Sequence, residues 1–80
     1  MVREGLLWYD NDPQRKVVDK VSRAVERYRS KLRHKPTVCY LNVKDFDGDI
    51  EEGNGVFLKP VSNILPHHFL IGVEATNAPR

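Results

Sequence analysis

Residues 12–36 read DPQRKVVDKVSRAVERYRSKLRHKP and contain the only long helical pattern of the chain. Asp12 is a good N-cap, and a proline at the next position suits the first turn of a helix. Pro36 disfavours the helical conformation at Lys35, so we expect the helix to end there. Its apolar residues fall on one stripe about 120° wide, which indicates a helix laid on a core. They are Val17, Val18, Val21, Ala24, Val25, Tyr28 and Leu32. At about 1.5 Å per residue this helix would be roughly 30 Å long.

Four short apolar stretches around the helix predict strands, because they are rich in β-branched and aromatic residues. They are residues 5–9, 37–43, 56–59 and 68–73. The acidic segment 44–55 carries two Asx-Gly turn dipeptides, so we expect it to form turns. Pro60 indicates that the third strand ends there or lies at an edge. The sequence thus predicts an α+β fold of order β-α-β-β-β, with one long amphipathic helix packed on a four-stranded mixed sheet.

Eighty residues are enough for one domain. We expect it to span residues 1–74, with residues 75–80 as a flexible C-terminal tail. The strands are apolar on both faces, whereas one helix about 10 Å across covers roughly two strands. The opposite sheet face, which we expect to carry aromatic side chains, therefore needs a partner. A symmetric homodimer is the simplest solution; a bound ligand, a different protein or coverage by the loops are the alternatives. The aromatics are Trp8, Tyr40, Phe57 and Phe69.

The charge of the chain is unevenly placed, although its net value is only +2. Residues 13–35 hold nine Lys/Arg against two acids, hence +7, and the rest holds four against nine, hence −5. Five cations of the helix are spaced by 4, 3, 4 and 4 and form a basic ridge: Lys16, Lys20, Arg23, Arg27 and Lys31. The ridge predicts a contact surface for nucleic-acid phosphates or an acidic partner. The alternatives are a solvated helix face, or a surface that pairs with the acidic part of a second copy.

Aspartates follow the first two expected strands. Because those strands flank the helix, we expect them to be parallel and joined by a right-handed crossover, and we consider the case in which they are also adjacent. Their C-terminal ends would then bring Asp10, Asp45, Asp47 and Asp49 to one sheet edge. Carboxylates suit Mg²⁺ or Ca²⁺, and with a metal they support phosphodiester chemistry. The alternative is structural: Asp10 serves a turn, Asp12 caps the helix, and the later group is a solvated loop.

Cysteine and histidine place few further constraints. The lone Cys39 excludes an internal disulfide and favours a reducing compartment, so we expect a cytoplasmic protein. No apolar run approaches the roughly 18 residues of a membrane span, and the first residues do not begin a signal peptide. His67 and His68 are neighbours on a strand, point to opposite faces and would not chelate one ion together.

No motif specific enough to assign a reaction is present in the sequence. The patterns therefore favour a small non-enzymatic interaction module without a cofactor, homodimeric and with the basic ridge as contact surface. Two alternatives remain at this point: a nucleic-acid-binding protein that uses the ridge, and a metal-dependent phosphodiester enzyme that uses the aspartates.

Overall fold

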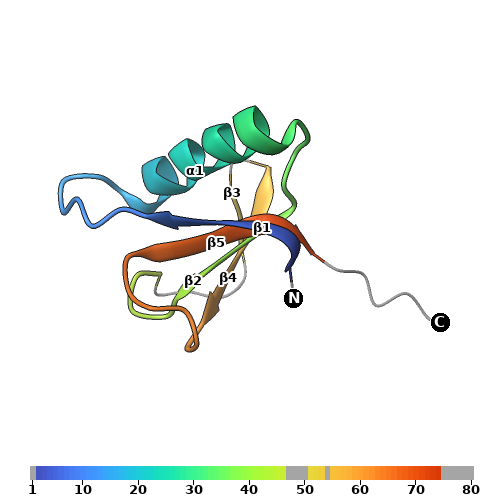
Figure 1. The fold of residues 1–80 in the computed structure, drawn as a ribbon. Helices are drawn as coiled ribbons and strands as arrows, with labels where there is room; N and C mark the ends of the chain where they lie inside the picture. The colour runs from blue at the N-terminus through green and yellow to red at the C-terminus, as the bar shows by residue number, and fades with distance from the viewer. Residues whose placement is uncertain (1, 47–50, 54, 75–80) are drawn as a thin grey trace.

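A computed structural model of the chain describes residues 2–46, 51–53 and 55–74. The elements are β1 (Val2–Tyr9), α1 (Val17–Leu32), β2 (Val38–Asn42), β3 (Glu51–Gly53), β4 (Val56–Val61) and β5 (His68–Glu74). The α+β fold is confirmed, because one helix packs on a mixed sheet whose four longer strands follow the order β-α-β-β-β (Figure 1). The tail expected over residues 75–80 lies outside the described residues.

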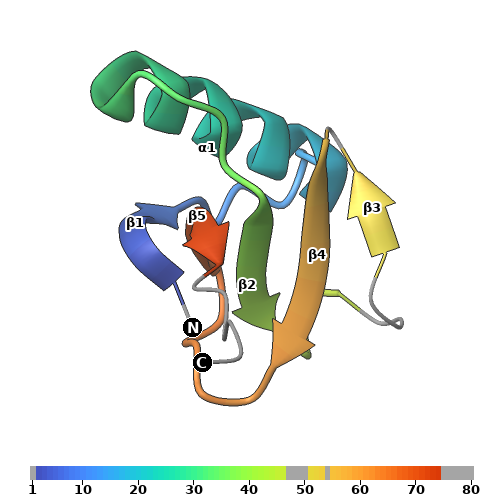
Figure 2. The ribbon, with the colours of Figure 1, turned by 90° about the vertical axis from the view of Figure 1, so that its right-hand side faces the viewer.

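The strand order across the sheet is β1-β5-β2-β4-β3 (Figure 2). β5 is antiparallel to both β1 and β2, so those two strands run in the same direction, as expected. They are not adjacent, because β5 lies between them. β5 carries the fully buried Phe69 and Ile71. A central position suits such an apolar strand, because it has a neighbouring strand along each edge. The neighbouring parallel pair is β2 and β4.

The helix is shorter at both ends than expected, with 16 residues and a length of about 24 Å. Asp12 does not cap it, because its carboxylate accepts a hydrogen bond from the Gln14 amide (2.9 Å) within a turn. The N-cap position is instead held by Lys16, whose side chain makes no capping hydrogen bond. At the other end Arg33 adopts a left-handed conformation (φ 66°) and donates its N–H to the Arg29 carbonyl (2.9 Å). The helix therefore ends at this left-handed cap, three residues before Pro36, and not at the proline as expected.

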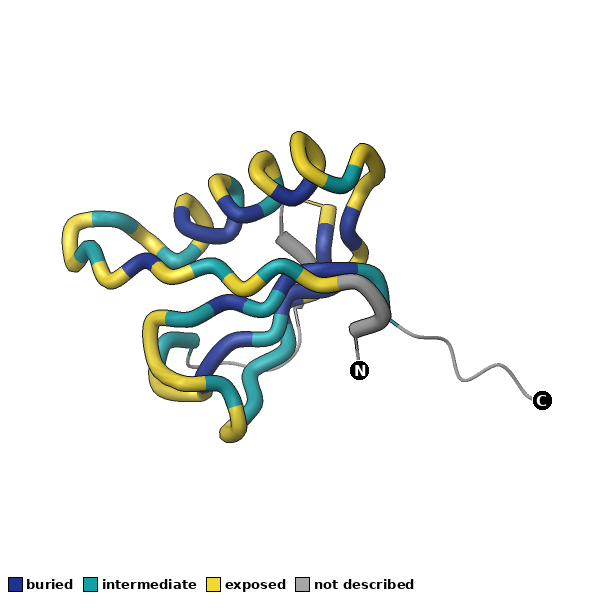
Figure 3. The backbone as a smooth tube through the Cα atoms, in the orientation of Figure 1, coloured by how far each residue is buried: buried dark blue, intermediate teal, exposed yellow. Residues whose placement is uncertain are grey.

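One core lies between α1 and the sheet. Its fully buried members come from the helix and from β2, β4 and β5: Val21, Ala24, Tyr28, Cys39, Leu41, Val56, Leu58, Phe69 and Ile71. Along α1 the buried and exposed stretches alternate with the helical period (Figure 3). The expected apolar stripe is therefore the buried face, except that Val18 is 52% exposed.

A short strand, β3, lies within the segment that we expected to consist of turns alone. β3 pairs antiparallel with β4, with Glu51 opposite Leu58 and Gly53 opposite Val56. The connection includes Gly55 with φ 80°, a conformation that glycine adopts without strain. Because β3 pairs only with the first half of β4, no strand of the described residues lies beside Pro60 on that edge, which is where a proline within a strand is tolerated.

Candidate functional site

The sheet face that points away from α1 has no helix over it in the part of the chain that the structure describes, although Val38 on this face is buried. Side chains alternate between the two faces of a strand, so those next to the core residues lie on this open face. Leu7, Tyr9 and Phe57 are 59%, 55% and 49% exposed there. Tyr40 and Leu70, which are opposite each other on β2 and β5, are half-buried between them. We call these five residues the open-face cluster.

The expectation of an aromatic open face was right for two of its four residues. Tyr40 and Phe57 lie on the open face, whereas Phe69 is fully buried in the core and Trp8 packs against that core from β1. The indole Nε1 of Trp8 is buried and has no hydrogen-bond partner among the described residues.

Three polar side chains on the open face form hydrogen bonds with one another. The Lys59 ammonium donates to both carboxylate oxygens of Glu74, at 2.7 and 2.9 Å. The Tyr40 hydroxyl donates to the same carboxylate at 3.0 Å. The hydrogen bond from Lys59, then that from Tyr40, lowers the pKa of Glu74, while desolvation opposes the shift. The hydrogen bond to Glu74 raises the pKa of Lys59. This face therefore carries one internally neutral ion pair.

The ends of β1 and β2 meet at one corner of the sheet, as their parallel direction requires. The Asp10 amide donates to the His67 carbonyl (3.0 Å), and the His67 amide donates to the Asp45 carboxylate. The His67 Nδ1 lies 3.8 Å from Asp45 Oδ1. Tyr9 contacts the rings of both His67 and His68, with centroid distances of 6.5 and 4.8 Å. These contacts fasten the loop before β5 to the ends of the other two strands.

Asp10 is buried and has its carboxylate fully engaged. Its oxygens accept hydrogen bonds from the Asp12 amide (3.0 Å) and from the Arg15 guanidinium (3.0 Å). Burial alone would raise the pKa of Asp10, but these hydrogen bonds and the positive charges of Arg15 and Lys20 hold that pKa below its ordinary value. Asp10 thus acts as an ionised anchor of the loop that leads into α1.

The metal hypothesis stays a prediction, although part of its geometry is visible. Asp10 and Asp45 reach the same sheet edge and contact the same residue, His67. Asp47 and Asp49 lie outside the described residues. Within the described part, no group of three or more His, Cys, Asp or Glu side chains could hold an ion.

The basic ridge is exposed at four of its five positions. Lys16, Arg23, Arg27 and Lys31 are exposed, whereas Lys20 is only 8% exposed. The expectation of a continuous exposed ridge was wrong at Lys20, because that residue lies close enough to the end of β1 to influence the Asp10 carboxylate. Whether the four exposed cations bind phosphates or an acidic partner remains a prediction.

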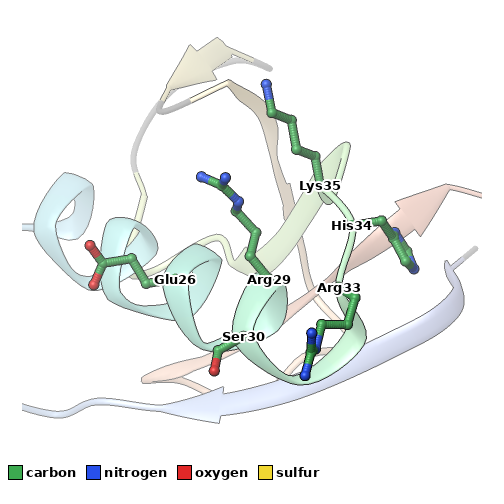
Figure 4. Close-up of a pocket in the computed structure, with 6 residues that line it drawn as sticks. All are labelled: Glu26, Arg29, Ser30, Arg33, His34 and Lys35. Carbon is green, nitrogen blue, oxygen red and sulfur yellow. The ribbon is translucent and has the colours of Figure 1, made fainter.

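A second group of exposed cations lies at the C-terminal end of α1, outside the basic ridge. Arg29, Arg33 and Lys35 line a surface hollow of about 590 Å³ together with Glu26, Ser30 and His34 (Figure 4). The high density of cations in this part of the sequence could have marked the group. The hollow itself could not be predicted, because it depends on the path that the chain takes after the helix.

Cys39 is buried in the core, and burial raises the pKa of its thiol to about 12. A neutral buried thiol is a poor nucleophile. Cys39 therefore behaves as a small hydrophobic core residue.

Neither a protein-family model, nor a curated protein, nor a solved structure matches this chain. No helix in the described part is long and apolar enough to cross a membrane.

Proposed function

We propose that the protein is a non-enzymatic interaction module that forms a homodimer through its open sheet face. The observation that carries this proposal is the half-exposed state of Leu7, Tyr9 and Phe57 on a sheet face that α1 does not cover. Each large apolar side chain removed from water contributes about 1.5–3 kcal/mol when fully buried, so a partner on this face gains substantial free energy.

A second copy of the chain suits this face better than a charged partner does. The central ion pair between Lys59 and Glu74 is neutral as a unit, so two copies of the face do not repel each other. Because Tyr40 also donates to Glu74, the face can be covered without leaving any of these three groups unpaired. A two-fold interface of this kind would place α1 of each copy on the outside. We also assign the protein to a reducing cytoplasmic compartment, where the free Cys39 stays a thiol.

Light scattering coupled to size exclusion tests the proposal at low and high salt. We expect the wild type to have the mass of a dimer in both conditions, because an apolar contact is not screened by salt. Leu7→Glu combined with Phe57→Glu places like charges on both halves of the contact and should give the mass of a monomer.

The matched control is Leu65→Glu, which adds a carboxylate at a residue that is 69% exposed in the loop before β5. This variant should stay a dimer. A wild type with the mass of a monomer would refute the proposal, and so would a dimer that survives both sheet-face substitutions. A dimer that dissociates in salt would indicate instead that the basic helix pairs with the acidic part of its twin.

A further inference from the structure

Two hollows adjoin at the C-terminal end of α1. The larger, of about 590 Å³, is the hollow of Figure 4. The smaller has about 180 Å³ and is lined by Val25, Arg29, Lys35, Pro36, Gly55 and Val56. Arg29 and Lys35 line both hollows, and their side chains extend to the same side of the helix end (Figure 4). These two cations therefore stand together at the boundary between a polar and an apolar space.

The larger hollow has a charge that matches a phosphate group. Arg29, Arg33 and Lys35 contribute three positive charges and Glu26 one negative charge, so the Lys, Arg and Glu side chains of its lining sum formally to +2. Outside β3, neither Arg29 nor Lys35 forms an ion pair with a carboxylate of the described residues. A phosphate monoester carries about −1.5 to −2 at neutral pH. A guanidinium fork beside an ammonium is a common pair of donors for such a group.

The smaller hollow has an apolar floor. Val25, Pro36 and Val56 supply it from the helix, the following loop and β4. Beside them Gly55 has a positive φ, and the space where a Cβ would stand is open. Apolar cavities of about 150 Å³ admit a benzene ring. The smaller hollow thus has room for an apolar group attached to the phosphate.

We propose that this end of α1 binds an organic phosphate monoester. The phosphate lies between Arg29 and Lys35, and the apolar group lies against Val25, Pro36 and Val56. The site is on the helix side of the sheet, away from the open face, so it does not depend on how the protein associates.

Isothermal titration with phenyl phosphate and with inorganic phosphate, at an ionic strength of about 0.15 M, tests the site. We expect phenyl phosphate to bind the wild type at least about threefold more tightly than inorganic phosphate, because only the ester fills the apolar hollow. Arg29→Ala combined with Lys35→Ala should weaken binding of phenyl phosphate by about tenfold or more, since two charge-assisted hydrogen bonds are lost.

The control variant is Arg23→Ala combined with Arg27→Ala, which removes the same charge from exposed positions of the basic ridge. It should leave the affinity within about twofold, because neither residue lines either hollow and salt at this concentration weakens the attraction of exposed charges outside the site. Equal weakening by both double variants would overturn the proposal in favour of unspecific attraction. Equal affinity for the two phosphates, or no binding of either at millimolar concentration, would also overturn it. Circular dichroism of each variant verifies that loss of binding is not loss of fold.

Discussion

At the scale of single residues, the buried carboxylate of Asp10 is stabilised by specific partners. Asp10 is buried, yet its pKa is lowered, since the Asp12 amide and the Arg15 guanidinium bind its ionised form. Lys20 is buried on the same side and adds favourable charge. The spacing of apolar residues along the helix does not predict that Asp10 and Lys20 come close together. Their proximity depends on the path of the turn that connects β1 to α1.

Asp10→Asn should therefore reduce the free energy of unfolding by about 1–3 kcal/mol at pH 7, the cost of breaking a partly buried charged hydrogen bond. The pKa of Asp10 is lower in the folded than in the unfolded chain, so this stabilisation is present above about pH 4 and is lost as the pH falls through the folded value. Urea unfolding at pH 7 and at about pH 3 measures the difference between wild type and variant. The difference should shrink at the lower pH, and an unchanged difference would contradict the role given to the charge. Asp19→Asn, at an exposed position, is the control.

At the scale of elements, α1 is held by its buried face more than by its ends. Val21, Ala24 and Tyr28 are fully buried against the sheet. The N-cap, in contrast, is Lys16, which offers no acceptor to the free amides of the first turn and places a positive charge at the positive end of the helix dipole. The beginning of the helix is thus set by the geometry of the loop that Asp10 and Asp12 organise.

Lys16→Asp should stabilise the protein by about 1 kcal/mol, because the new carboxylate can accept from the first-turn amides and suits the helix dipole. Thermal or urea unfolding measures the gain. Lys16→Ala removes the same positive charge without adding an acceptor, so it should give a smaller change. If both variants gave the same stability, the missing cap would not be what limits this helix end.

At the scale of the whole molecule, α1 covers one sheet face, and no helix of the described part covers the other. α1 supplies the only helical cover in the described part and lies on one side of the sheet (Figures 1 and 2). The open-face cluster therefore leaves apolar surface exposed to water. This exposure weakens the hydrophobic stabilisation of a small domain, since a chain of this size buries only about 60% of its unfolded surface.

If this face forms a dimer, the melting temperature should depend on protein concentration. A hundredfold increase in concentration should raise it by about 5 °C or more, because association stabilises only the folded chains. Calorimetry over that range measures the shift. The variant that carries Leu7→Glu and Phe57→Glu should show no such dependence, and a wild type without it would speak against self-association.

The sequence by itself determined the kinds of elements and the apolar side of the helix, because period and turn chemistry act over a few neighbouring residues. It therefore predicted one amphipathic helix, four strands and an uncovered sheet face that includes Tyr40 and Phe57. Only the tertiary structure decided that β5 lies between β1 and β2 and that Lys20 is buried. The same holds for the site between Arg29 and Lys35, whose floor includes Val56 from a distant strand. Such contacts join residues far apart in the chain, and no local pattern specifies which distant segments meet.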